Sequence, residues 1–175
     1  MDNINLEIPE ILIDQKTLQR RINEMGKKIT EVYKNKHLIV ISVSNGATIF
    51  VADLIRKIDL PMQLDSISAS SYEGTESRGK VDIFSRLKLD IKGHNILLVD
   101  DILDTGRTMM KIVEFLHSMN PESVETCVLL DKPARRVVKV EADYYGFEVP
   151  DVFVVGYGLD HNEYYRNLSY VGQLK

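Results

Sequence analysis

Three carboxylates lie close together between Ile96 and Met110, in the stretch ILLVDDILDTGRTMM. A short apolar run leads directly into Asp100 and Asp101, and Asp104 follows soon after. Burying adjacent carboxylates at the end of a strand is costly unless hydroxyl groups or a cation satisfy them. The spacing therefore predicts that this strand end binds a ligand with hydroxyl groups, a cation, or both.

The residues that follow Asp104 suit a phosphate group. Thr105, Gly106, Arg107 and Thr108 stand at the start of a predicted helix, where backbone N–H groups are free to donate and the helix dipole favours an anion. A site for a diol beside a site for a phosphate has the shape of a pentose 5-phosphate. The alternative is that Asp104 or Thr105 only caps the helix and the acids are solvated, which accounts for one acid but not for three.

Other motifs for phosphate, metal or hydrolytic chemistry are absent from the sequence. No glycine is followed by Lys and then Ser or Thr, which excludes a Walker loop, and no Gly-x-Ser-x-Gly occurs. Gly156 and Gly158 lack the third glycine of a dinucleotide fingerprint, because His161 stands at that position. Cys127 is the only cysteine, so no internal disulfide or multi-thiolate metal site can form.

The elements around the acidic stretch predict an α/β fold. Apolar residues recur at steps of three and four from Leu18 to Val32, the pattern of an amphipathic helix that Asp14 could cap. The order strand, polar turn, helix, strand then occurs twice, which implies a mostly parallel twisted sheet with helices on both faces. The predicted strands are 38–43, 62–71, 95–99 and 124–130, and 153–156 is a further short strand.

The segment 70–80, SSYEGTESRGK, separates the two units. It is polar, contains two glycines and has no periodicity, and alternation resumes at Val81 and Ile83. Loops of this length in a compact domain are usually functional lids or disordered segments. We expect a mobile loop within a β-ribbon that acts as a lid.

The composition fits one folded domain over residues 1–175. The chain carries 22 Lys and Arg against 26 Asp and Glu, a net charge of −4, which disfavours general nucleic-acid binding because such binding depends on neutralising phosphates. No apolar run approaches the ~18 residues of a membrane span, and the acidic first residues do not fit a signal peptide. We expect a cytoplasmic protein that binds neither nucleic acid nor membrane.

The stretch VDDILDTG, residues 99–106, resembles the phosphoribosyl pyrophosphate (PRPP) motif of the type I phosphoribosyltransferase family. The resemblance extends over nearly the whole chain. Three further stretches resemble the branch of the family that acts on hypoxanthine and guanine: LLDKPARR at 129–136, YYGFEVPDVFVVGYGLD at 144–160 and EYYRNLSYVG at 163–172. The resemblance implies the type I fold, with a small hood beside the main sheet.

Residue by residue, the resemblance implies a PRPP site. Asp100 and Asp101 match the acidic pair that binds the ribose hydroxyls, directly and through magnesium-bound water. Asp104 matches the acid near purine N7 that serves as general base or acid. The other matches are the 5-phosphate loop, the pyrophosphate-binding arginine and the start of the closing loop: Thr105, Gly106, Arg107 and Thr108; Arg166; and Ser71 with Tyr72.

The purine side is matched by Lys132, Phe153, Val154 and Asp160. Lys132 corresponds to the lysine that donates to the purine 6-oxygen, which suits an ammonium group with three donors and no acceptor. Phe153 corresponds to the aromatic residue stacked on the base, and Val154 and Asp160 offer backbone groups to the purine edge. Asp160 also corresponds to a magnesium contact. Without the resemblance, Lys132 reads as a surface charge, Phe153 as core and Arg166 as a surface ion pair.

One departure concerns the turn after the first strand. The family usually has Leu-Lys-Gly there, in a pyrophosphate loop with a cis peptide, whereas this chain has Ser44, Asn45 and Gly46. Asn45 and Gly46 still match PRPP-binding positions, but the basic side chain is missing.

The implied reaction is a Mg²⁺-dependent transfer of phosphoribose from PRPP to N9 of hypoxanthine or guanine. The products are IMP or GMP and pyrophosphate, and the implied assembly is a homodimer or homotetramer. Two alternatives stay open: a transferase that prefers xanthine, and a regulator that senses PRPP on the same fold.

Overall fold

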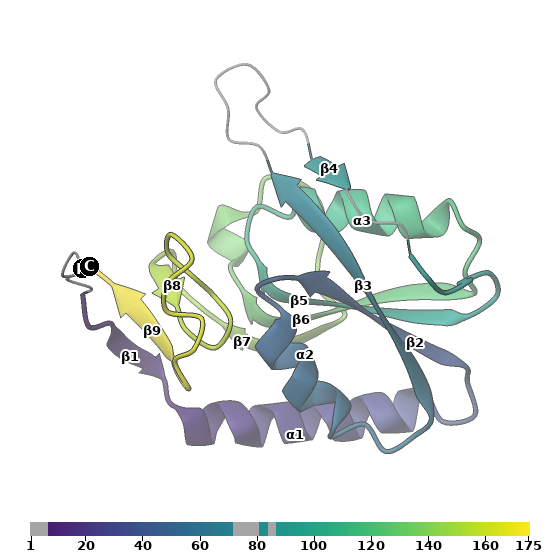
Figure 1. The fold of residues 1–175 in the computed structure, drawn as a ribbon, viewed down its shortest axis with the longest axis horizontal. Helices are drawn as coiled ribbons and strands as arrows, with labels where there is room; N and C mark the ends of the chain where they lie inside the picture. The colour runs from purple at the N-terminus through teal and green to yellow at the C-terminus, as the bar shows by residue number, and fades with distance from the viewer. Residues whose placement is uncertain (1–6, 72–80, 84–86) are drawn as a thin grey trace.

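The computed structural model describes residues 7–71, 81–83 and 87–175, and its centre is a six-stranded sheet (Figure 1). The strand order is β4-β3-β2-β5-β6-β7. All neighbours pair in parallel except β4, which pairs with β3 in the antiparallel direction. The mostly parallel sheet is confirmed. Its strands are β2 (Leu38–Ser44), β3 (Met62–Ser71), β4 (Val81–Ile83), β5 (Asn95–Leu103), β6 (Ser123–Asp131) and β7 (Tyr144–Glu148).

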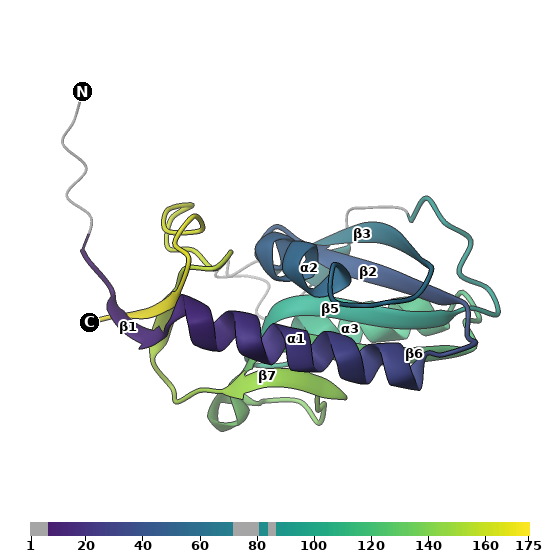
Figure 2. The same cartoon turned by 90° about the horizontal axis from the view of Figure 1, so that it is seen from below.

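Helices cover both faces of this sheet, as the βαβ order predicts. The helices α1 (Gln15–Val32) and α2 (Thr48–Ile55) share one core cluster with Val40 and Leu97 of the central strands. The helix α3 (Arg107–His117) shares the other cluster with Ile41 and Leu98. Figure 2 shows α1 and α3 on opposite sides of the strands. Because successive strand residues point to opposite faces, the continuous apolar runs of β2 and β5 supply both cores.

The first helix forms as its sequence pattern predicts. The residues Leu18, Ile22 and Ile29 are fully buried along one face of α1. The Oδ1 atom of Asp14 accepts a hydrogen bond from the backbone N of Thr17 at 2.8 Å and caps the helix start. The helix runs beneath both the main sheet and the smaller one (Figure 1), so it ties the two together.

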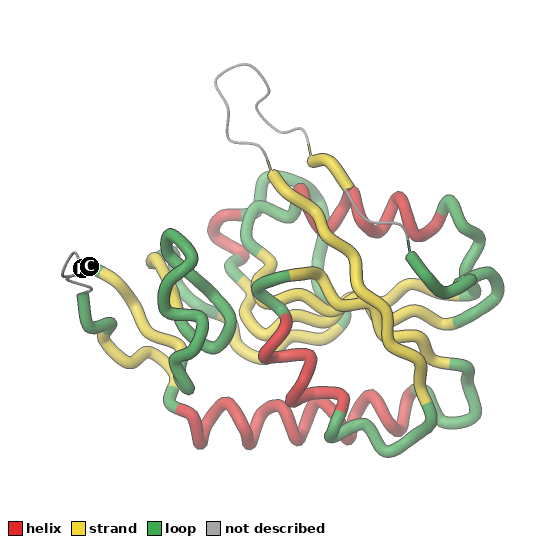
Figure 3. Tube along the Cα trace, viewed as in Figure 1, coloured by secondary structure: helices red, strands yellow, loops and turns green. Residues whose placement is uncertain are grey.

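A second, antiparallel sheet of three strands lies beside the main one and corresponds to the predicted hood. Its order is β1-β9-β8, and it joins the two ends of the described chain. The loop between β8 and β9, green in Figure 3, folds back towards α2. The three strands are β1 (Glu10–Ile13), β8 (Phe153–Val155) and β9 (Val171–Leu174).

The predicted β-ribbon is confirmed at its base, where Ala69 pairs with Ile83 and Ser71 with Val81. The predicted lid falls mainly on residues 72–80, including Tyr72, which lie outside the described residues. Ser71 ends β3, and only its backbone is described. Within the described ranges, no helix is both long and apolar enough to cross a membrane.

A close contact between α1 and the turn after α2 generates a test of this packing. Gly26 on α1 lies against Lys57, and a Cβ at Gly26 would be 2.7 Å from the backbone oxygen of Lys57. Alanine is ordinarily favoured over glycine within a helix by about 1 kcal/mol. Here the backbone clash wins, and we expect Gly26→Ala to lower the free energy of unfolding by about 1–3 kcal/mol.

Urea unfolding measures this difference, with the exposed neighbour Lys27→Ala as control, which we expect to stay within about 0.5 kcal/mol of the wild type. A stabilised Gly26→Ala variant would contradict the observed helix contact.

Candidate active site

The two adjacent acids lie at the carboxyl end of β5, the strand between β2 and β6. Asp100 is buried, with 9% of its surface exposed. Its Oδ1 accepts the backbone N–H of Asp101 at 2.9 Å, and Asp101 Oδ1 accepts that of Ile102 at 2.8 Å. Burial and the neighbouring Asp101 carboxylate raise the pKa of Asp100 well above its ordinary value. Burial likewise raises the pKa of Asp101.

The turn after β2 approaches these acids through Gly46. A Cβ at this position would lie 1.8 Å from Asp101 Oδ2, so any larger residue would displace the Asp101 carboxylate. The peptide between Ser44 and Asn45 is cis, as in the loop that the family pattern implies. The Asn45 side chain is exposed.

The start of α3 follows the acids without a side-chain cap. Gly106 is the N-cap residue, with φ 83°, and no side chain bonds to the first turn from that position. A Cβ at Gly106 would lie 2.4 Å from Val140 Cγ1. Thr105 Oγ1 stands 3.5 Å from the backbone N of Arg107, the long limit of a hydrogen bond. Asp104 therefore does not cap this helix, and the first turn faces the site with its N–H groups.

A cavity of about 440 Å³ opens over this strand end, and we call it the acidic cavity. It gathers residues from six separate parts of the chain: the end of β2 with the turn after it, β3, the end of β5, the start of α3, the 3-10 turn after β6 and the loop between β8 and β9. The predicted site residues in its lining are Gly46, Asp100, Asp101, Asp104, Thr105, Gly106, Thr108, Asp160 and Arg166. Arg107, also predicted, has an exposed side chain and, like Asn45, is not part of that lining.

A second cavity of about 630 Å³ adjoins the first, and we call it the lysine cavity. Lys132, Phe153 and Val154 line it together with Asp101, Asp104 and Asp160. These three acids thus belong to both cavities. The structure brings the two predicted halves of the site into contact at these three acids, Asp104 among them.

Lys132 is buried, whereas most lysine side chains are exposed to solvent. Only 6% of its surface is exposed, and burial lowers the pKa of its ammonium group. Its Nζ donates to the backbone oxygen of Val152 at 2.6 Å, and its backbone N donates to Leu103 O at 3.0 Å. Phe153, by contrast, is 53% exposed. Neither the surface-charge interpretation of Lys132 nor the core interpretation of Phe153 holds.

Arg166 is held by acids and by backbone at the edge of the acidic cavity. Its Nη2 lies 2.9 Å from Asp160 Oδ1 and 2.9 Å from Glu163 Oε2, and its Nη1 donates to Gly158 O at 2.8 Å. Its positive charge also lowers the pKa of Asp101, against the larger effect of burial. The arginine therefore offsets part of the negative charge of the cavity.

Two arginines that the sequence analysis did not select also contact this site. Nε of Arg135 lies 3.1 Å from Asp104 Oδ1, an oxygen that is shielded from solvent and has no hydrogen-bond partner among the described residues. Arg136 donates to the backbone oxygens of Leu103 and Asp104 and to the carboxylate of Asp131. Both follow Lys132 in the LLDKPARR stretch, and the 3-10 turn Pro133–Arg135 directs them back to β5.

The donor set of the acidic cavity fits a hard divalent cation. Asp100 and Asp101 offer carboxylate oxygens in a desolvated place, where a positive partner would offset the cost of burying both charges. Across the described ranges, however, no three or more His, Cys, Asp or Glu side chains are grouped to hold a metal. The residues therefore fit an ion such as Mg²⁺, which brings most of its ligands as water and substrate oxygens.

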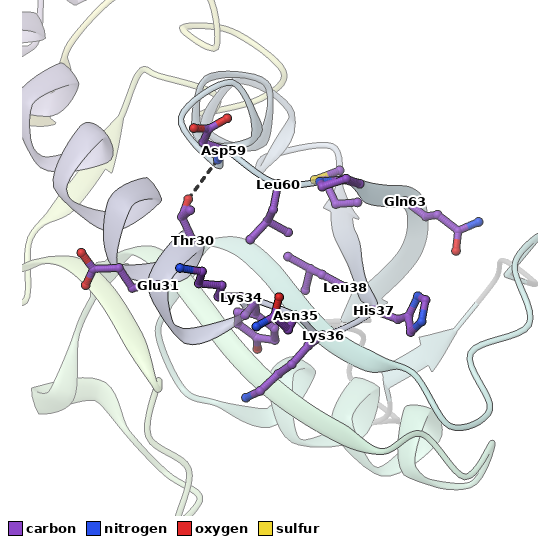
Figure 4. A pocket seen from close by; sticks show the side chains of 13 residues that line it. Thr30, Glu31, Lys34, Asn35, Lys36, His37, Leu38, Asp59, Leu60 and Gln63 are labelled. Carbon is purple, nitrogen blue, oxygen red and sulfur yellow. Dashed lines mark hydrogen bonds between the residues drawn. The ribbon is translucent and has the colours of Figure 1, made fainter.

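A third cavity, larger than either of these two, lies elsewhere. It measures about 820 Å³ and is lined by the end of α1 and by the starts of β2 and β3, including Tyr33, Leu38 and Met62 (Figure 4). Ligands of open parallel sheets bind at the carboxyl ends of strands, whereas this cavity is at the amino ends. It holds none of the predicted site residues.

The phosphoribosyl transferase domain model matches residues 10–162. The chain belongs to the phosphoribosyltransferase family. It is 44% identical over 170 residues to the hypoxanthine-guanine phosphoribosyltransferase of Staphylococcus epidermidis, which covers 97% of this chain and 95% of the relative. A crystal structure of a hypoxanthine phosphoribosyltransferase from Staphylococcus aureus superposes with a TM-score of 0.92 at 41% identity, over 99% of this chain and 97% of that one.

A third relative is longer than this chain. The bifunctional protein TilS/HprT of Listeria monocytogenes is 42% identical over 175 residues, which is 99% of this chain but 27% of the relative. The fold of the present chain is the type I phosphoribosyltransferase fold that the resemblance implies.

The buried acid pair generates a prediction about stability and pH. The folded-state pKa of Asp100 is raised, so ionisation of this carboxyl opposes folding above about pH 4. We expect Asp100→Asn to raise the thermal midpoint by a few degrees at neutral pH. The gain should shrink as the pH falls below the folded-state pKa and vanish below about pH 4, where the wild-type carboxyl is protonated in both the folded and the unfolded protein.

Calorimetric melting curves from pH 5 to 8 measure this, with Asp59→Asn, an exposed acid outside the site, as control. A destabilised Asp100→Asn variant at neutral pH would mean that the charge of Asp100 supports the fold.

Proposed function

We propose that this chain transfers phosphoribose from PRPP to N9 of hypoxanthine or guanine, and releases pyrophosphate with IMP or GMP. The relatives whose names state this activity are similar over nearly the whole chain. In the reaction, the bond from purine nitrogen to C1 of the ribose forms as the bond to pyrophosphate oxygen breaks. Pyrophosphate leaves with the electron pair, and the proton on the purine must go to a base.

The observation that carries the proposal is the junction of two cavities at Asp104. One cavity offers carboxylates, hydroxyls and a helix start, and the other offers a buried ammonium group and an exposed aromatic ring. A sugar phosphate suits the first and a 6-oxopurine the second. Asp104 borders both, which is where a base that takes the purine proton has to be.

In the acidic cavity, Asp100 and Asp101 accept hydrogen bonds from the ribose hydroxyls. Thr105, Gly106 and Thr108 receive the 5-phosphate at the start of α3, where the dipole and the N–H groups favour an anion. Arg166 and the turn at Gly46 contact the pyrophosphate. Arg107 and Asn45 complete this set through their backbone groups, because their side chains are exposed.

In the lysine cavity, Lys132 selects the base. Its ammonium group donates one hydrogen bond to Val152 O and has further donors for a purine oxygen, but it offers no acceptor to the amino group of adenine. The exposed ring of Phe153 stacks on the purine. Val154 and Asp160 contribute backbone groups to the purine edge.

Mg²⁺ fits this site as a partner of the substrate, with Asp100, Asp101 and Asp160 as the nearby carboxylates. When bound, it neutralises charge on the departing pyrophosphate. The protein residues orient the ribose, hold the purine and exclude water from a sugar centre with cationic character. Arg136 donates hydrogen bonds to the backbone oxygens of Leu103 and Asp104. It thereby holds Asp104, the general base, where the two cavities meet.

The experiment that tests the function is turnover of PRPP with hypoxanthine, guanine, xanthine and adenine side by side. We expect turnover with hypoxanthine and guanine, and little with adenine. Preference for xanthine would identify the chain as a xanthine-preferring phosphoribosyltransferase. Binding of PRPP without turnover on any base, together with a shift of DNA in a gel, would identify a regulator and overturn the proposal.

We also propose that the chain acts as a single phosphoribosyltransferase domain that assembles into a homodimer or homotetramer in the cytoplasm. Exposed apolar side chains such as Ile11, Leu64 and Val137 are available for contacts between copies. Light scattering of the purified protein measures the number of subunits.

Asp104→Asn tests whether Asp104 is the general base that takes the purine proton. The amide has the same shape but cannot accept the purine proton, and general acid-base catalysis typically contributes about 10²- to 10⁴-fold. We expect turnover to fall in that range with PRPP binding nearly unchanged. Asp151→Asn is the matched control, because Asp151 also pairs with Arg135, at 3.5 Å. Equal turnover in the two variants would exclude Asp104 as the base.

Lys132→Met tests whether the ammonium group of Lys132 selects the purine. The substitution removes this group and keeps the aliphatic part of the side chain. We expect the KM for hypoxanthine and guanine to rise about ten- to a hundredfold, as for a lost hydrogen bond to a charged group, while the poor activity with adenine changes little. The exposed Lys139→Met serves as control. If the KM rises to the same degree for all four purine bases, Lys132 supports the fold and does not recognise the purine.

A further inference from the structure

Tyr157 lies at a sharp turn of the loop that follows β8. Its φ of 54° is in the left-handed region, and its neighbours Gly156 and Gly158 have φ 93° and 105°. A bulky residue rarely adopts such a φ, and it persists only where surrounding contacts hold it. The side chain is 3% exposed, so the contacts that hold it are inside the protein.

Those contacts come from the first two helices. The Tyr157 hydroxyl donates to Asp53 Oδ2 on α2. Gln19 on α1 donates from Nε2 to the same oxygen at 2.6 Å and to the Tyr157 hydroxyl oxygen at 3.1 Å. None of these three residues lines either cavity of the site. We call them the Tyr157 clamp.

The clamp leads to the site through two glycines. Gly158 packs so closely on the turn after β2 that a Cβ there would lie 2.1 Å from Gly46 O. Gly46 in turn packs on Asp101 Oδ2, at 1.8 Å from where its own Cβ would be. The turn also continues directly into α2, because Thr48 N donates to Asn45 O at 3.1 Å. Asp53, Tyr157, Gly158, Gly46 and Asp101 thus form an unbroken series of contacts.

We propose that the Tyr157 clamp is a positioning device for the pyrophosphate end of the substrate site, an inference that rests on the proposed function. By holding the loop onto α2, the clamp fixes Gly158 against Gly46 and Gly46 against the acid pair. The same loop carries Asp160 and Arg166, and Gly158 O accepts the hydrogen bond from Arg166 Nη1. The lysine cavity, which takes the purine, contains neither Gly46 nor Gly158.

Tyr157→Phe removes the hydroxyl and keeps the ring. We expect the KM for PRPP and the dissociation constant for Mg²⁺-pyrophosphate to rise about 5- to 20-fold, within the effect of one lost hydrogen bond to a charged group. The KM for hypoxanthine should stay within about twofold, because neither Gly158 nor Gly46, through which the clamp reaches the site, lines the lysine cavity. Asp53→Asn should give the same pattern, and the double variant should add little to either single one.

Tyr33→Phe is the matched control. Tyr33 is also buried, at 1% exposure, and its hydroxyl donates to a carboxylate oxygen of Glu125 at 2.8 Å, but it lies at the far end of α1. We expect it to lose stability like Tyr157→Phe and to keep both KM values. A Tyr157→Phe variant with unchanged PRPP kinetics, or with both KM values raised alike, would overturn the positioning role.

The remaining outcomes are also decisive. If Tyr157→Phe and Asp53→Asn both fail to fold, the clamp is a requirement of the fold and the proposal is wrong. If the wild type neither turns over PRPP nor binds Mg²⁺-pyrophosphate, the proposed function itself fails. If the wild type is active and Tyr157→Phe leaves the KM for PRPP unchanged, the positioning role of the clamp is wrong and the proposed function stands.

Discussion

Asp100 and Asp101 stand side by side near the carboxyl end of β5, where Asp100 is buried and Asp101 is partly buried. Burial of two neighbouring like charges raises the free energy of the folded protein and the pKa of both groups. The surroundings reduce this cost only in part, through single backbone N–H donors and the positive charge of Arg166. The acid pair is therefore suited to a partner with hydroxyl groups and positive charge.

The rest of the architecture serves this pair. The parallel sheet brings the ends of β2 and β5 to one edge, glycine at position 46 lets the turn after β2 reach Asp101, and Gly158 lets the hood loop reach Gly46. Each close approach depends on the absence of one Cβ atom. The two cavities then share Asp101, Asp104 and Asp160, and under the proposed function this shared region contacts both substrates.

Much of this could be predicted from local sequence. The apolar runs of β2 and β5, the amphipathic pattern of α1 and the acids before a Thr-Gly turn carry their own signals, because strand burial and helix starts depend on neighbouring residues. The burial of Lys132 could be expected only from the resemblance, since an isolated lysine has no such signal. The roles of Arg135 and Arg136 depend on a short turn that redirects two ordinary arginines onto β5. The Tyr157 clamp joins residues more than a hundred positions apart, and nothing in the spacing of Gln19, Asp53 and Tyr157 indicates it.

The central claim is that the acid pair receives its positive partner together with the substrate. Calorimetric titration of Mg²⁺ into the protein, alone and with saturating pyrophosphate or PRPP, tests it most directly. The account predicts weak binding to the free protein and much tighter binding in the presence of either phosphate compound, because Mg²⁺ keeps several waters and binds through few carboxylates together with substrate phosphates. Tight binding to the free protein, unchanged by pyrophosphate or PRPP, would mean that Asp100 and Asp101 form a metal site of their own and would contradict their assignment to the ribose hydroxyls.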